Sequence, residues 1–168
     1  MTFAAKAVTP AAPLDPRVTS GTWYVTRTSL PLWRRLDNPS VTYAALPTGQ
    51  IVDTVRATTR TRSAGPGHER LILGLDTPLE QAGTFEWRGL SPLTRLARSR
   101  WEVLAHDPEA RLWAVTLFGR TPFTPAGLDI YTRAPWLLPD LEAPLLRFLA
   151  TQPAAAPDLP RLFAPRHT

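Results

Sequence analysis

Between Gly21 and Thr132 the sequence is divided into short runs rich in β-branched and aromatic residues, with turn residues between them. No amphipathic helix long enough for a parallel crossover separates these runs, so they are expected to pair as antiparallel neighbours. Eight strands in such an order can close into an up-and-down barrel, which removes the unpaired sheet edges. The strands are expected at residues 21–29, 41–46, 50–60, 70–75, 84–88, 99–106, 111–118 and 127–132.

One helix is expected after the last strand. Asp140 is a candidate cap, and Leu141, Leu145, Phe148 and Leu149 share one helical face, which should pack against the outer wall of the barrel. The chain has 168 residues, a length that supports one core without metal or disulfide bonds. The predicted division is a disordered arm at 1–13, a barrel domain with its helix at 14–150, and an irregular tail rich in proline and alanine at 151–168.

Composition excludes several kinds of protein. The sequence has no cysteine, so it forms no disulfide and has no thiol nucleophile, which favours a reducing compartment. The N-terminal residues lack the apolar core of a secretory signal, and no apolar run approaches the ~18 residues that span a bilayer. A cytoplasmic protein without a membrane span is therefore expected. Its net charge of +5 comes from 18 arginines and one lysine, a bias that most simply reflects GC-rich coding and is weak evidence for an anionic partner.

Alternation along the strands predicts which side chains face the barrel interior, because every second residue lies on the same face of a strand. The aromatic face of each strand is expected inside, since the charged residues opposite are best kept in water. Two alternatives remain for this interior: a filled aromatic core, or an apolar pocket for one small ligand. The candidate pocket residues are Tyr43, Phe85, Trp87, Trp101, Val103 and Ile130.

Gly21-Thr22-Trp23 on the first strand, with Arg133 closing the last strand, resembles the lipocalin family, especially its bacterial type. The resemblance continues through 41–46, through the hairpin at 103–115 and into the segment 130–135. It implies a barrel closed at one end, where Trp23 packs under the guanidinium of Arg133 in a structural role. The turn at His106-Asp107-Pro108 lacks the Thr-Asp-Tyr element of many lipocalins, and no lipidated cysteine or signal precedes the domain.

Catalytic and metal-binding motifs are absent from the sequence. There is no phosphate-binding loop, no Gly-x-Ser-x-Gly and no His-Glu-x-x-His, and the three histidines are scattered. We therefore expect no catalytic residue, no metal and no cofactor. Four carboxylates lie within predicted strands, and the favoured interpretation places them outside, paired with cross-strand arginines. They are Asp53, Glu86, Glu102 and Asp129.

The sequence thus predicts a barrel that binds or carries a small hydrophobic ligand, such as a fatty acid or another lipid-like molecule. Two alternatives remain open. One is a hydrolase or isomerase of the same fold, with a carboxylate inside the barrel acting on a hydrophobic substrate. The other is a surface that binds anions or nucleic acid through the arginines from Arg56 to Arg62. That stripe carries no aromatic residues, so a solvated face is favoured and no nucleic acid partner is expected.

Overall fold

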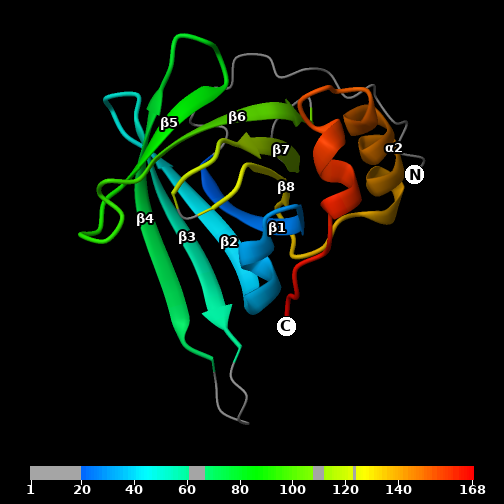
Figure 1. The fold of residues 1–168 in the computed structure, drawn as a ribbon, viewed down its shortest axis with the longest axis horizontal. Coiled ribbons are helices and arrows are strands. Elements are labelled where there is room, and N and C mark those ends of the chain that lie inside the picture. The colour runs from blue at the N-terminus through cyan, green and yellow to red at the C-terminus, as the bar shows by residue number, and fades with distance from the viewer. Residues whose placement is uncertain (1–19, 61–66, 108–111, 123) are drawn as a thin grey trace.

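The computed structural model describes residues 20–60, 67–107, 112–122 and 124–168. Eight antiparallel strands follow one another around a closed barrel, and the last strand pairs with the first (Figure 1). The strands are β1 (Gly21–Thr28), β2 (Leu36–Ala45), β3 (Ile51–Thr59), β4 (Glu69–Pro78), β5 (Thr84–Gly89), β6 (Arg98–His106), β7 (Trp113–Phe118) and β8 (Gly127–Thr132). This architecture confirms the predicted fold class.

Two strands are longer than the sequence pattern predicts. After a 3-10 helix, η1 (Pro31–Arg35), β2 begins at Leu36 and passes through Pro39, where the pairing register with β3 shifts between Asp37 and Ser40. Such an irregularity tolerates proline within a strand, and Asn38 has a positive φ of 53° there. At the other end of the sheet, β4 continues to Pro78, so that Asp76 lies within the strand and not in the following loop.

The barrel wall separates two hydrophobic clusters. The inner cluster includes Trp23, Val41 and Tyr43. The outer cluster joins residues of β6, β7 and β8 to the helix α2 (Pro139–Ala150), whose Leu145 and Leu149 are fully buried. Figure 1 shows α2 on one side of the barrel, as the apolar face of its sequence predicts.

The start of α2 differs from the prediction that Asp140 caps it. Leu138 occupies the N-cap position without a side-chain cap hydrogen bond, and Pro139 follows as the first helical residue. Proline suits this position because its missing N–H would have no partner in the helix. Asp140 therefore lies in the first turn, where its negative charge interacts favourably with the helix dipole.

The segment after α2 is more ordered than the expected irregular tail. It contains the 3-10 helix η2 (Ala156–Arg161) and then returns to the barrel, where Phe163 forms a β-bridge with Thr28. Farther along, Arg166 forms an ion pair with the buried Asp37. The predicted arm at 1–13 lies outside the described residues, and the division into three segments stays a prediction. None of the helices in the described part of the chain has the length and apolarity needed to span a bilayer.

Candidate binding site inside the barrel

One end of the barrel is closed by a contact between β1 and the residue that follows β8. The guanidinium carbon of Arg133 lies 3.5 Å from the centre of the Trp23 ring. The same guanidinium donates hydrogen bonds to the carbonyl oxygens of Thr22 (2.9 Å) and Ser20 (3.0 Å). Gly21 has a φ of 95°, which glycine adopts without strain. The structure thus brings Gly21, Trp23 and Arg133 together at the end opposite η1.

Four aromatic rings form a stacked wall inside the barrel, with Trp101 at its centre. The Trp101 ring lies 4.5 Å from that of Phe85, 5.8 Å from that of Tyr43 and 6.2 Å from that of Phe118, measured between ring centres. The interplanar angles are all below 30°, so the rings stack and do not meet edge to face. These residues come from β2, β5, β6 and β7, which places the aromatic wall across half of the barrel.

The other three candidate pocket residues have different positions. Val103 belongs to the inner cluster, and Trp87 packs against it while staying partly exposed. Ile130 was predicted inside but lies in the outer cluster with Leu145 and Leu149, so this placement is wrong. Every residue of β8 is buried, because α2 covers its outer face, and hydrophobic alternation therefore cannot tell its two faces apart.

Three carboxyl groups face the barrel interior. Asp53 lies two residues before the inward-facing Val55 on β3, and Asp129 lies two residues before the inward-facing Tyr131 on β8, so each aspartate shares the inner face of its strand. Asp53 is 5% exposed, Asp129 is 2% exposed and Asp76 on β4 is not exposed at all. The prediction that the strand carboxylates lie outside is therefore wrong for Asp53 and Asp129. It holds for Glu86, which faces outward and contacts Arg98.

Two indole groups orient the carboxyls of Asp53 and Asp76. Trp87 Nε1 donates a hydrogen bond to Asp53 Oδ1 (3.0 Å), and Trp101 Nε1 donates one to Asp76 Oδ1 (2.7 Å). Gly74 pairs directly with Asp53 across β3 and β4, and a Cβ atom there would collide with both partners of the Trp87–Asp53 bond. The missing side chain of Gly74 thus makes room for the contact between Trp87 and Asp53. Asp76 is tied to the aromatic wall through its hydrogen bond from Trp101.

Burial changes the protonation of all three interior carboxyls. It raises the pKa of Asp53 to about 6, although hydrogen bonds from Trp87 and from backbone N–H groups oppose the change. Burial and the nearby charge of Asp53 raise the pKa of Asp76 to about 8. Burial also raises the pKa of Asp129 to about 7. These groups therefore gain or lose protons near neutral pH, whereas an aspartate in water stays ionised there.

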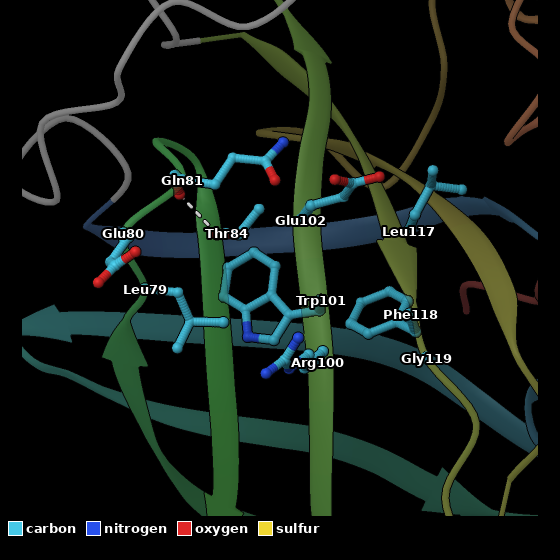
Figure 2. Close-up of a pocket in the computed structure, with 10 residues that line it drawn as sticks. All are labelled: Leu79, Glu80, Gln81, Thr84, Arg100, Trp101, Glu102, Leu117, Phe118 and Gly119. Carbon is cyan, nitrogen blue, oxygen red and sulfur yellow. Dashed lines mark hydrogen bonds between the residues drawn. The ribbon is translucent and has the colours of Figure 1, made fainter.

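A hollow with a volume of about 690 Å³ opens beside the aromatic wall. Figure 2 shows the Trp101 ring between Leu79 and Phe118 in this hollow, with Glu102 and Gln81 toward one end of the view. Trp101 therefore lines the hollow and also holds Asp76. On neighbouring strands, Val55 and Trp87 are only partly buried. The residues that line the hollow are Leu79, Glu80, Gln81, Thr84, Arg100, Trp101, Glu102, Leu117, Phe118 and Gly119.

The arginine stripe on β3 is engaged by carboxylates. Arg56 lies 3.5 Å from Glu69, and Arg60 lies 2.7 Å from Asp37, while Arg62 is outside the described residues. Within the described ranges, no three side chains of His, Cys, Asp or Glu gather in a way that could hold a metal ion.

No protein-family model matches this sequence, and no curated protein matches it. Solved structures do match its fold. One is the structure of the siderocalin Ex-FABP, a protein described as functioning through dual ligand specificities. It shares 15% sequence identity with this chain over 90% of this chain and 95% of its own, with a TM-score of 0.59. The chain has a lipocalin fold. At this low identity the likeness concerns the lipocalin barrel itself, and the residues inside the barrel must be interpreted from their own chemistry.

Sequence reasoning missed Asp76, which is the most buried of the interior carboxyls. It lies in the segment Asp76-Thr77-Pro78, whose composition is typical of a turn. Alternation along β4 points the wrong way, because the apolar face of Leu71, Leu73 and Leu75 would be predicted inside and Asp76, on the opposite face, outside. In the structure Leu71 and Leu73 are exposed, and Asp76 lies inside the lipocalin barrel with Gly74.

Proposed function

We propose that this protein binds a small, largely apolar molecule inside its lipocalin barrel, against the wall formed by Tyr43, Phe85, Trp101 and Phe118. The observation that supports this proposal most is the position of Trp101, which lines a hollow of about 690 Å³ while stacking on the other rings. Protein sites for small molecules have volumes of about 300–1,000 Å³ and apolar, aromatic linings. The dual ligand specificities described for Ex-FABP, which shares the fold, agree with a binding role.

Within this proposal, a fatty acid or another lipid-like molecule would lay its apolar chain along the aromatic wall. The arginines Arg56 and Arg60 face carboxylates, which supports a protein without a nucleic acid partner. The absence of cysteine supports a reducing compartment such as the cytoplasm.

Titration with the neutral fluorescent probe N-phenyl-1-naphthylamine tests the binding proposal. We expect saturable binding of one probe per chain, with quenching of tryptophan emission, because the probe would stack against Trp101. Trp101→Ala should weaken binding by at least about tenfold, since a buried aromatic contact contributes at least ~1.4 kcal/mol. Trp136→Ala is the matched control, because Trp136 is 62% exposed and lies outside the barrel lining.

The proposal fails if the wild-type protein shows no saturable binding, or if Trp136→Ala weakens binding as much as Trp101→Ala does. Circular dichroism of both variants shows whether the barrel is retained. A normal spectrum for Trp101→Ala together with lost binding assigns the effect to the site.

Acid–base chemistry on the bound molecule is a second candidate function, favoured by the two interior carboxyls Asp53 and Asp76. Each is held by an indole N–H, and their raised pKa values allow one to be protonated while the other is ionised near neutral pH. Incubation of a bound molecule followed by mass spectrometry separates the two functions. A binding protein returns the molecule unchanged, whereas an enzyme returns a product whose formation is lost in Asp76→Asn.

A further inference from the structure

The interior carboxyls differ from Asp37 and Asp158, two other buried aspartates, in what lies beside them. Asp37 is buried between Arg60 and Arg166, and Asp158 forms an ion pair with Arg161. In the described part of the chain, no positively charged side chain forms an ion pair with Asp53, Asp76 or Asp129. The chain has 18 arginines and uses some of them for buried carboxylates elsewhere, but none of the buried residues that the structure describes is an arginine.

Some of the hydrogen-bonding capacity of these carboxyls is unused. Asp76 Oδ2 is buried and has no hydrogen-bond partner. Asp129 differs, because hydrogen bonding from Thr28 and Trp33 opposes the rise of its pKa. A buried polar atom without a partner costs about 1–3 kcal/mol, so native structures rarely contain one without a reason. The free oxygen of Asp76 is suited to accept a hydrogen bond from a molecule that enters the barrel.

The carboxyl group of Asp76, including its oxygen without a partner, is held in a fixed orientation by neighbouring side chains. Trp101 donates to the other oxygen of Asp76, and Trp87 donates to Asp53, so indole groups fix both carboxyls in place. The same Trp101 ring stacks between Phe85 and Phe118, and it lines the hollow. Negative charge and aromatic faces are thus combined within one wall of the barrel. Both features attract cations, the first by direct charge and the second through the negative face of each ring.

Resting on the proposed function, we infer that the ligand carries a positively charged amine, which binds at Asp53 and Asp76 while its apolar body lies on the aromatic wall. A protonated amine brings up to three N–H donors, which supply the partner that Asp76 Oδ2 lacks. Its positive charge also favours the ionised form of Asp76, because it offsets the negative charge of Asp53 that raises the pKa of Asp76. A molecule ending in a carboxylate, such as an ionised fatty acid, would meet the negative groups at Asp53 and Asp76, where none of the buried residues that the structure describes is an arginine or lysine. Arg100 lines the hollow but is exposed to solvent.

Three probes that share one ring and differ in charge test this inference. They are 2-phenylethylamine, which is positively charged at neutral pH, the neutral 2-phenylethanol, and the anion phenylacetate. Calorimetric titration of the wild-type protein should show the amine binding at least about tenfold more tightly than the alcohol, and phenylacetate binding most weakly, because a charge-assisted hydrogen bond contributes about 1.5–3 kcal/mol.

Variants then locate the charge effect. Asp76→Asn should reduce the affinity for the amine by at least about tenfold and leave the affinity for the alcohol within about twofold, because only the charged interaction is removed. Asp53→Asn provides an independent variant if Asp76→Asn does not fold. Glu86→Gln is the matched control, since Glu86 lies on β5 beside Trp87 but faces outward toward Arg98.

The outcomes separate this inference from the proposed function. If the alcohol binds as well as the amine, the barrel binds small molecules but the amine assignment is wrong. If phenylacetate binds most tightly, the interior carboxyls do not select charge as inferred, and the assignment is also wrong. If none of the three probes binds and the neutral naphthylamine probe also fails, the proposed function itself is contradicted.

Discussion

Replacing Trp23 by alanine is expected to lower the free energy of unfolding by about 3–5 kcal/mol, since a large buried aromatic side chain is lost and a cavity remains. Trp23 is 1% exposed and lies in the inner cluster at the closed end of the barrel. The change also removes the ring over which the Arg133 guanidinium is placed at 3.5 Å. In thermal unfolding, this loss corresponds to a decrease of about 10 °C in the melting temperature.

Trp136→Ala is the control for the stability measurement. Trp136 is 62% exposed, so its removal should change the free energy of unfolding by less than about 1 kcal/mol. Equal melting temperatures for the two variants would show that the contact between Trp23 and Arg133 does not close the barrel.

The stability of the wild-type protein is expected to decrease as pH rises from about 4 to about 7. Burial raises the pKa of Asp129 from 3.8 to about 7, so in this range the folded protein holds a proton that the unfolded chain releases. Raising the pH therefore favours unfolding, and the full change corresponds to at most about 4 kcal/mol for this group. Asp53 and Asp76 act in the same direction, because burial raises the pKa of each.

Urea unfolding at a series of pH values measures this effect. Asp129→Asn should make the decrease between pH 4 and 7 smaller, because asparagine stays neutral while Asp53 and Asp76 still contribute, and the variant should be more stable than the wild type above about pH 7. Asp140→Asn is the control, since Asp140 is exposed at the start of α2. The pKa of Asp37 is lowered by its two arginines despite burial, so its contribution is lost only below this window. A wild-type stability that rises with pH between 4 and 7 would contradict the placement of these carboxyls.

The barrel is predictable from the sequence because its signals are local. Strand length, turn chemistry and the Gly21-Thr22-Trp23 motif are each contained in a few consecutive residues, and short connections force neighbouring strands to pair. Part of the aromatic wall follows from the same reasoning, since Phe85 and Trp101 alternate with charged residues that mark the outer face of their strands. Phe118 does not follow from it, because both faces of β7 are apolar and largely buried.

The polar interior is not predictable in this way, because it contradicts the assumption that charged residues lie in water. Asp53 and Asp129 would be assigned outside by that assumption, and the position of Asp76 depends on how far β4 extends. The prediction for Ile130 is wrong for a different reason. Because α2 packs on the outer face of β8, that face is apolar and has no charged residues that would distinguish it from the inner face. Irregular strand pairing also limits prediction from alternation. Because the register shifts between Val103 and Ala105, Val103 lies in the inner cluster and Ala105 in the outer cluster.

Nuclear magnetic resonance of the indole N–H groups tests most directly whether a small molecule binds beside the interior carboxyls. The six tryptophans give six indole signals, which single Trp→Phe variants assign. Titration with 2-phenylethylamine should shift the signals of Trp87 and Trp101 in a saturable manner, because these groups donate to Asp53 and Asp76. The signal of the exposed Trp136 should stay in place. If the Trp87 and Trp101 signals do not move, or if only the Trp136 signal moves, the barrel interior is not the binding site.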